Sequence, residues 1–538
     1  MLKLRRAQAF SKELIEKIPQ KGYNFKINLI ALVAQWIEQA RPKGKMWVRF
    51  LPRAPSEMTL PLEIKNILEK LQEAGYEGYI VGGCVRDLLL KNPPTSGPKD
   101  WDVTTNAKPE EIQKIFPDHV YENGFGTVGI KTGSENPLLA IVEVTPYRIE
   151  GKYTDKRHPD EIKFADKLED DLSRRDFTVN SIAVDINGKV TDLFGGQEDI
   201  KKKTIKTVGN PEERFSEDAL RLLRAVRLAT VLNFSIEDKT LKAVRDNAEW
   251  LRTISKERIR DEFVKIIESD NAYDGILLLE ETGLLQYILP ELREGIDVKQ
   301  NLHHIYTVWE HNTRTLKYTS EKKYSLVVRL ASLFHDVGKP RSKRGEGLHS
   351  TFYGHEVIGA KMVAEIMNRL KFPNELSERI IKMVRFHMFY YNVGEVTESS
   401  VRRLIANIGL ENVEDLIKVR EADRISSGRP KAVPYKLRHL KYIIDKVSHD
   451  PISAKMLKID GEDLMKELGI APGPKVGLIL NSLLAEVIDD PIKNTKENLI
   501  KRVHELDKKS PEELRKSLER IEKAVEDEEK DRMKKYYV

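Results

Sequence analysis

The chain has 538 residues, of which 33% are charged, and it contains one cysteine, Cys84. No apolar run approaches the ~20 residues that a membrane-spanning helix needs, so a membrane-spanning protein is excluded. The lone cysteine excludes a disulfide framework and fits a cytoplasmic protein. The length predicts roughly three to four domains.

The positive charge is concentrated at the beginning of the chain. Residues 1–57 contain twelve Lys/Arg and four Glu, and the remainder is slightly acidic, although the whole chain has a formal net charge of +6. Nucleic-acid contacts of the remainder must therefore come from local patches. The stretch AQWIEQARPKGKMWVRFLPRAP has no helix or strand period and resembles a translated tRNA gene. We expect residues 1–57 to be a non-native or disordered extension and Met58 to be the native start; a genuine basic tail is the alternative.

The sequence VGGCVRDLLL, from Val81 on, predicts a strand end, a Gly-Gly turn and a helix start. Gly82 and Gly83 let backbone N–H groups close on an anion, and the helix N-terminus favours negative charge. Arg86 lies one turn into the helix, within reach of a phosphate oxygen. This stretch therefore predicts a phosphate-binding turn.

A carboxylate pair follows in KDWDVTT. The strand that we expect at 100–104 places Asp100 and Asp102 on the same face. Two adjacent carboxylates suit hard cations such as Mg²⁺, and a phosphate-binding turn followed by such a pair is typical of two-metal nucleotidyl transfer. The stretch resembles the nucleotidyltransferase core of the class II tRNA CCA-adding enzymes and the related bacterial poly(A) polymerases. A turn and a solvated strand end, unrelated to each other, are the simpler interpretation.

Three further features of the same region bear on this resemblance. Glu143, in the expected strand AIVEVTPYR, is a candidate third carboxylate; a Glu paired with a neighbouring cation is the alternative. The polar segment 150–164 predicts a mobile loop, and its resemblance to a loop of the CCA-adding members favours addition of all three nucleotides. Arg174, Arg175 and Asp176 match the family's RRD motif, whose arginines would stabilise phosphate charge and whose aspartate would accept from a ribose hydroxyl.

The helix that we expect over FSEDALRLLRAVRLATVL begins with Ser216 as N-cap. Asp218 and Arg221 can recognise the feature that cytosine and adenine share, an amino donor beside a ring-nitrogen acceptor, and reject uracil and guanine. The family's EDxxR motif corresponds to Glu217, Asp218 and Arg221, and the resemblance adds two further nucleotide contacts, Arg224 and Arg227. A solvated basic stripe is the alternative.

A series of His and Asp residues follows on successive expected helices. Their order resembles that of the HD metal-dependent phosphohydrolases, which implies that one ion is bound by His311, His335, Asp336 and Asp423, and that a second ion is bound with help from His355 and His387. Such ligands suit Mn, Ni or Fe as well as Mg²⁺. Lys339 and Arg341, beside the HD pair, suit a phosphate ester. Some relatives keep only a helical scaffold at this place, so the activity of the site is a separate question.

These features predict an α+β protein with a small mixed α/β nucleotidyltransferase head and an all-helical neck, body and tail. The expected boundaries are 1–57 for the extension, 58–190 for the head, 191–255 for the neck, 256–430 for the HD-type body and 431–538 for a tRNA-binding tail. The sequence gives no oligomeric state.

The expected enzyme adds C, C and A to tRNA from CTP and ATP with two Mg²⁺ and no nucleic-acid template. One alternative is a bacterial poly(A) polymerase, although those enzymes carry a basic run where this chain has NGFGTVGIK. An enzyme that adds only CC or only A is another. The last is an HD phosphohydrolase with a vestigial head.

Overall fold

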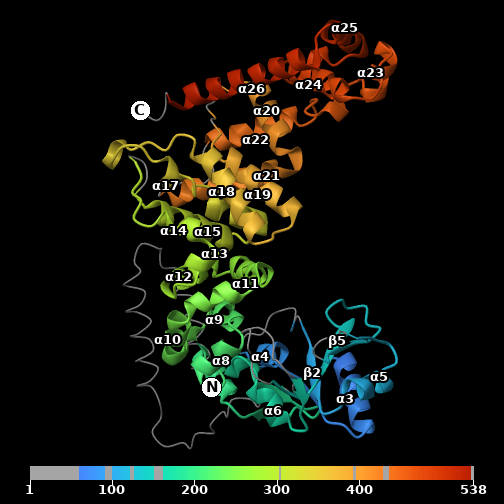
Figure 1. Cartoon of the computed structure of the whole chain (residues 1–538), viewed down its shortest axis with the longest axis vertical. Helices are drawn as coiled ribbons and strands as arrows, with labels where there is room; N and C mark the ends of the chain where they lie inside the picture. Colours follow the sequence, from blue (N-terminus) through green and yellow to red (C-terminus); the bar gives the residue numbers. More distant parts are fainter. Residues whose placement is uncertain are drawn as a thin grey trace, which may run out of the picture. The chain divides into compact units, whose positions relative to one another are not determined.

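The computed structural model of the chain describes residues 60–90, 98, 100–121, 126–150, 162–301, 305–389, 391, 396–427 and 435–534. The expected extension 1–57 and most of the loop expected at 150–164 lie outside these residues. Residues 60–538 belong to one compact unit. The structure has the expected α+β architecture, with one mixed sheet followed by helices (Figure 1).

A seven-stranded sheet carries the first part of the described chain. Its spatial order is β3 (His119–Tyr121), β4 (Val128–Lys131), β5 (Ile141–Pro146), β2 (Asp102–Thr105), β1 (Gly78–Val81), β8 (Ile182–Val184) and β9 (Val190–Asp192). Strands β2 and β5 are parallel, and the other neighbours are antiparallel. The sheet core contains Ile80, Val103, Val142 and Val144, all fully buried. The alternation of exposed and buried residues in β5 leaves one face for polar side chains.

Five helices accompany the sheet. They are α3 (Leu62–Glu73), α4 (Gly83–Leu89), α5 (Pro109–Ile115), α6 (Leu168–Ser173) and α7 (Gly196–Lys202). Helix α3 buries Ile64, Ile67, Leu68 and Leu71 at helical spacing, whereas Leu62 in its first turn is exposed. Strands β6 (Arg148–Glu150) and β7 (Ile162–Phe164) form a separate antiparallel pair.

The next segment is mainly helical. It contains α8 (Pro211–Glu217), α9 (Leu220–Leu232), α10 (Asp238–Asp246), α11 (Lys256–Glu268) and α12 (Ala272–Glu281). The short strands β10 (Thr204–Ile205) and β11 (Ser235–Ile236) pair in parallel beside α9, and both isoleucines are buried. Helix α9 packs against α11 and α12, so two of its faces are covered by protein.

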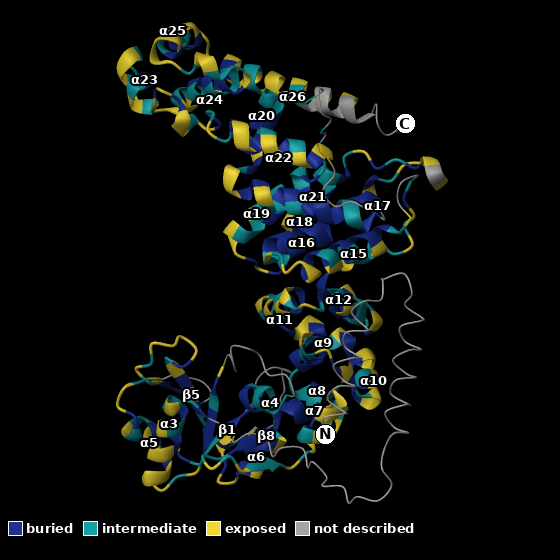
Figure 2. Ribbon diagram, turned by 180° about the vertical axis from the view of Figure 1, so that it is seen from behind, coloured by how far each residue is buried: buried dark blue, intermediate teal, exposed yellow. Residues whose placement is uncertain are grey.

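A helical bundle follows. Its helices are α15 (Val308–Glu321), α16 (Leu326–Phe334), α17 (Lys339–Ser342), α18 (His355–Arg369), α19 (Asn374–Phe386), α20 (Glu398–Ile408), α21 (Val413–Ser426) and α22 (Tyr435–Val447). Helix α16 is buried from Val327 to Phe334 and packs against α15, α19 and α21 (Figure 2). The helix that carries the HD pair at its C-terminal end is therefore the centre of the bundle.

The last helices have a core of their own. They are α23 (Gly461–Leu468), α24 (Pro474–Asp489), α25 (Lys496–Asp507) and α26 (Pro511–Lys534), and their buried side chains include Leu464, Ile479, Val503 and Leu514. Helix α26 begins with a capping box, in which Ser510 Oγ accepts from Glu513 N at 3.2 Å and the Glu513 carboxylate accepts from Ser510 N at 2.7 Å. In the described part of the chain, no helix combines the length and the apolar character needed to cross a membrane.

Candidate functional site

The expected phosphate-binding turn has a conformation that only glycine tolerates well. Gly82 precedes α4 with φ +82°, and a Cβ atom there would lie 3.2 Å from Arg175 Nη1 and 3.3 Å from Asp102 Oδ2. The turn, a carboxylate and a guanidinium therefore converge at one point. Arg86, one turn into α4, is held by Asn180, whose Oδ1 accepts from Nη1 at 2.8 Å.

The two expected metal carboxylates do not lie in one strand. Asp100 is in a bend, and β2 begins only at Asp102, so the strand expected at 100–104 is wrong by two residues at its start. The side chain of Trp101 between them is buried, which pins the chain as it enters the sheet. Glu143 lies beside Asp102 in the parallel register of β2 and β5, and such neighbours point to the same face of a sheet.

The electrostatics of this face suit a cation. Burial raises the pKa of Asp102 above its ordinary value, Asp100 adds to the shift, and Arg175 opposes it. A divalent cation would offset both the burial of Asp102 and its repulsion by Asp100, and carboxylate oxygens are ligands that Mg²⁺ accepts. A metal site at Asp100, Asp102 and Glu143 stays a prediction, because among the described residues only side chains of the helical body bring three ligand atoms within 4.8 Å of one another.

Buried Asp171 orients the arginines of the RRD motif, a role that the sequence did not indicate. Its Oδ1 accepts from Arg174 Nε at 2.9 Å, and its Oδ2 accepts from Arg175 Nη2 at 3.1 Å. Burial raises the pKa of Asp171, but Arg175 and Arg174 outweigh it and hold the pKa below 3.8. The carboxylate thus stays ionised and keeps Arg175 beside Gly82.

The helix expected over residues 215–232 is broken at its start. Ser216 lies inside α8, whose N-cap is Asn210, so Ser216 is not the N-cap that we expected. Asp218 has an extended backbone between α8 and α9, and its Oδ1 accepts from Leu220 N at 3.0 Å. Ala219 is the N-cap of α9, and the bond from Leu220, the first residue of the helix, fixes the carboxylate of Asp218 beside the helix start. The other carboxylate oxygen, Oδ2, accepts from Arg258 Nη2 in α11 at 2.8 Å.

The arginines of α9 contact protein on every turn, so the alternative of a solvated stripe is wrong. Arg221 is buried; it donates to Glu217 and, through Nη2, to Arg174 O at 3.3 Å. Arg227 Nε lies 2.6 Å from an oxygen of Glu262, which is itself buried. The stripe therefore lies between the RRD segment and α11.

Buried Asp176 and half-buried Arg224 form a pair between the RRD segment and α9. Asp176 Oδ2 accepts from Arg224 Nε at 2.7 Å, and Oδ1 accepts from Phe177 N at 2.9 Å. Burial raises the pKa of Asp176, but the charges of Arg224 and Arg221 hold it far below its ordinary value. These contacts position Arg224; the contact of Asp176 with a ribose hydroxyl stays a prediction.

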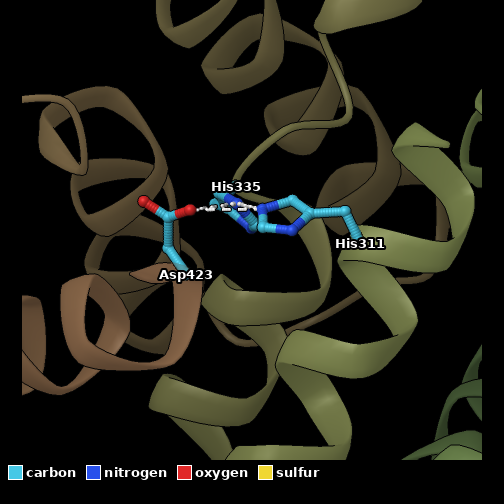
Figure 3. A group of neighbouring side chains, drawn as sticks. All are labelled: His311, His335 and Asp423. Atoms are coloured by element: carbon cyan, nitrogen blue, oxygen red, sulfur yellow. Dashed lines mark hydrogen bonds and ion pairs between the residues drawn. The ribbon is translucent and has the colours of Figure 1, made fainter. Parts of the chain in front are cut away.

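The His and Asp residues of the body meet inside the helical bundle, and all six are buried. Figure 3 shows His311, His335 and Asp423 pointing at one another. His311 Nε2 lies 3.0 Å from His335 Nε2 and 3.2 Å from Asp423 Oδ1. His355 Nε2 and His387 Nε2 lie 3.4 Å apart. Two groups of three close ligand atoms result: His311, His335 and Asp423, and Asp336, His355 and His387.

Asp336 joins these two groups, which differs from the assignment to a single ion that we expected. Its Oδ2 lies 3.2 Å from His335 Nε2 and 3.4 Å from His311 Nε2, whereas its Oδ1 lies 3.3 Å from His355 Nε2 and 3.6 Å from His387 Nε2. One carboxylate therefore reaches both groups with a different oxygen. Asp336 would therefore contact a cation held by either group.

The ring orientations fit a metal cluster. The Nδ1 atoms of His335, His355 and His387 each lie 2.7 to 2.8 Å from a backbone carbonyl oxygen, which can only accept, so each Nδ1 carries the proton. In the neutral rings the Nε2 lone pairs then point into the cluster, where a cation would accept them. We name these six residues the His–Asp cluster.

Burial and neighbouring charges set the protonation states of the cluster, and these states suit the binding of a cation. Burial lowers the pKa of His387 to about 4, so this ring is neutral at pH 7. Burial raises the pKa of Asp336, but the charges of His335 and Lys339 outweigh this effect and hold the pKa well below 3.8. Lys339 Nζ lies 2.6 Å from Asp336 Oδ2 and donates to Gln300 at 2.7 Å. Asp336 raises the pKa of His335 against the effect of burial, so a bound cation would displace a proton there.

Comparison with known proteins identifies relatives along most of the chain. The family model Poly A polymerase head domain matches residues 78–206, the model Probable RNA and SrmB- binding site of polymerase A matches 233–296, and tRNA nucleotidyltransferase domain 2 matches 356–503. The CCA-adding enzyme of Lactobacillus helveticus is 32% identical over 448 residues, which are 82% of this chain and 96% of that enzyme. That of a Geobacillus species is 34% identical over 447 residues, 82% of this chain and 95% of that enzyme.

A solved structure agrees. The crystal structure of the Bacillus stearothermophilus CCA-adding enzyme in complex with CTP superimposes with a TM-score of 0.59 at 26% identity. The match covers 84% of this chain and 98% of that one.

Proposed function

The chain belongs to the family of the CCA-adding enzymes, and from this premise we propose that it is a nucleotidyltransferase that adds C, C and A to the 3′ end of tRNA from CTP and ATP. The observation that carries the proposal is the convergence of Gly82, Asp102 and Arg175, with Glu143 beside Asp102 in the sheet. These groups supply a phosphate site and a metal site side by side.

In the proposed reaction Asp100 and Asp102 would hold two Mg²⁺, and Glu143 would serve as a third ligand. When bound, the ions activate the tRNA 3′-hydroxyl and neutralise the triphosphate and the leaving pyrophosphate. The backbone of Gly82 and Gly83 and the side chains of Arg86 and Arg175 bind and orient phosphate oxygens. Gly82 also leaves room for the carboxylate and the guanidinium to approach each other.

We propose that Asp218 and Arg221 select the base. Asp218 accepts from the amino group of cytosine or adenine, and Arg221 donates to the adjacent ring nitrogen. Uracil and guanine would instead place a carbonyl oxygen against the carboxylate of Asp218 and a ring N–H against the guanidinium of Arg221. Such a mismatch costs a few kcal/mol when it is buried. The fixation of Asp218 by Leu220 N and Arg258 supports this role, because selection without a template needs groups that are already in place.

Nucleotide incorporation tests the proposal. The chain is incubated with Mg²⁺ and a tRNA that lacks its 3′ end, and products are resolved by length. We expect two additions with CTP alone and a third when ATP is added. A long ladder of A would identify a poly(A) polymerase, a single A on tRNA ending in CC without use of CTP would identify an A-adding enzyme, and no addition would refute the proposal.

A second activity is favoured by the His–Asp cluster. We propose that it binds two divalent cations, such as Mn, Ni, Fe or Mg²⁺, that Asp336 bridges them, and that the site hydrolyses phosphate esters. The buried Nε2 atoms directed at one another support this. Metal analysis and a phosphoesterase assay test it: Asp336→Asn should lose metal and phosphoesterase activity but keep CCA addition. Wild-type protein that retains no metal after exposure to each of these cations would contradict the proposal.

Two broader assignments follow from the same premise. We propose that residues 431–538, with their separate helical core, help to hold the tRNA. We also place the reaction in the cytoplasm, a setting that fits the single buried cysteine.

A further inference from the structure

A buried asparagine links the phosphate-binding turn to the RRD motif. Asn180 ends the 3₁₀ turn Thr178–Asn180, which follows the motif and packs against α4. Its Oδ1 accepts from Arg86 Nη1 at 2.8 Å, and its Nδ2 donates to Asp176 Oδ1 at 3.4 Å. One amide therefore connects the arginine of α4 with the aspartate of the motif.

The two partners explain why the linking side chain is an amide. A guanidinium can only donate and an ionised carboxylate can only accept, so Arg86 needs the oxygen of Asn180 and Asp176 needs its NH₂ group. An aspartate at position 180 would lack this donor and would repel Asp176. It would also add a second negative charge to Arg86, which already forms an ion pair of 2.7 Å with Asp87. A neutral side chain holds Arg86 and leaves its positive charge available to an anion.

Arg86 keeps donors for a ligand. Its Nε and Nη2 donate to Asp87 Oδ1 at 2.9 and 2.7 Å, and Nη1 donates to Asn180, so three of its five N–H groups have partners among the described residues. The other two belong to Nη1 and Nη2, and a Cβ atom on Gly83 would lie 4.0 and 3.5 Å from these nitrogens. The guanidinium therefore lies beside the expected phosphate-binding turn, with donors that suit phosphate oxygens.

We propose that Asn180 is a positioning residue for nucleotidyl transfer, which holds Arg86 against the triphosphate and ties it to Asp176, the residue that we expect to accept from the ribose. The inference rests on the function proposed above and adds to it a residue that acts through its neighbours. Asp87 holds the Nε–Nη2 edge of the guanidinium, and Asn180 holds Nη1. Without Asn180 the guanidinium is free to swing about its contact with Asp87, so it binds the triphosphate less well.

The first test is the KM of Asn180→Ala for each substrate. We expect KM for CTP and for ATP to rise about tenfold, the equivalent of one charge-assisted hydrogen bond, because both carry the same triphosphate. KM for tRNA and the preference for CTP over UTP should not change. Neither KM nor this preference depends on the fraction of folded protein. The control is Asn187→Ala, at an exposed asparagine between β8 and β9, which should keep the KM values of the wild type.

A double-mutant cycle tests whether Asn180 acts through Arg86. In an Arg86→Ala background, Asn180→Ala should cause little further loss of kcat/KM, because the side chain that it positions is already absent. Asn180→Asp keeps the size of the side chain but places a carboxylate oxygen beside Asp176. This variant should therefore lose more kcat/KM than Asn180→Ala does.

Three results would overturn the proposal: an unchanged KM for CTP in Asn180→Ala, an equal loss from Asn180→Ala with and without Arg86, and wild-type behaviour of Asn180→Asp. A wild-type enzyme that adds no nucleotide would refute the proposed function instead. The Kd of CTP with Mg²⁺, measured by titration calorimetry on the same variants, would then decide the role of Asn180. A tenfold rise of this Kd in Asn180→Ala would support the proposal, and an unchanged Kd would refute it.

Discussion

Removal of Arg258 tests whether the carboxylate of Asp218, which we propose selects the base, must be held in place. Arg258 is the side chain that fixes Asp218 from α11, with an Nη2 to Oδ2 distance of 2.8 Å, and without it the carboxylate keeps the bond from Leu220 N. A hydrogen bond between charged groups contributes about 1.5–3 kcal/mol, and the side chain of Arg258 is 31% exposed, so we take about 1–2 kcal/mol. This corresponds to a factor of about 5–30.

We therefore expect Arg258→Ala to lower kcat/KM for CTP and ATP by this factor and to lower the preference for CTP over UTP. The assay is incorporation into tRNA lacking its 3′ end, with each nucleotide tested separately. Arg258→Lys is the matched control: it keeps the charge but not the planar fork, and should fall between the wild type and alanine. The ratio between nucleotides does not depend on the fraction of folded protein. An unchanged ratio in Arg258→Ala would refute the reasoning.

Three further predictions concern the head and the body. Gly82→Ala should lower nucleotide incorporation by about 10²-fold, because the added Cβ would press on Asp102 and Arg175. The control Gly188→Ala has a similar φ of +78° but no atom within 4 Å of the added Cβ, so it should keep nearly full activity. Equal losses in the two variants would contradict this prediction. Asp171→Asn should lower the free energy of unfolding by about 2–3 kcal/mol. The folded-state pKa of Asp171 lies below 3.8, so its carboxylate stabilises the fold only while it is ionised. Urea titrations should therefore show the full difference in unfolding free energy between wild type and Asp171→Asn at pH 5–7, and a smaller difference as the pH falls below about 4. A difference that persists at low pH would refute the assignment. By elemental analysis, His311→Ala should retain about one metal ion per chain where the wild type holds about two, and Asp336→Asn should lose both. Equal metal losses in the two variants would argue against a bridging Asp336.

The sequence indicated most of the head because its signals are local. Strand β1 ends at Val81, where a strand end was expected, and the turn at Gly82 has the positive φ that a glycine pair predicts. The error at Ser216 has a local cause too. Serine is a good N-cap residue, and periodicity alone did not indicate that the expected helix is interrupted at Asp218, where the backbone is extended.

The partners of the functional side chains could not be predicted in the same way. Arg258 is 40 residues from Asp218, and Arg224 is 48 residues from Asp176. No periodicity or motif indicates which carboxylate a distant arginine will meet, because the meeting depends on how the helices pack. For the same reason the sequence indicated six candidate ligands in the body but not that Asp336 would face both groups.

These distant partners explain how a protein site can replace a template. Asp176 with Arg224, Asp218 with Arg258, and Arg227 with Glu262 are three ion pairs that tie α9 to the RRD segment and to α11. Removing one partner of a largely buried pair leaves the other charge uncompensated. Asp176 and Glu262 are the buried members of these pairs, whereas Arg224 and Arg258 are about a third exposed, so water partly screens their pairs. Asp218 and Arg221 are thereby held in place against a mismatched base. If they select the base as we propose, selectivity for cytosine and adenine depends on this rigidity as well as on the two residues themselves.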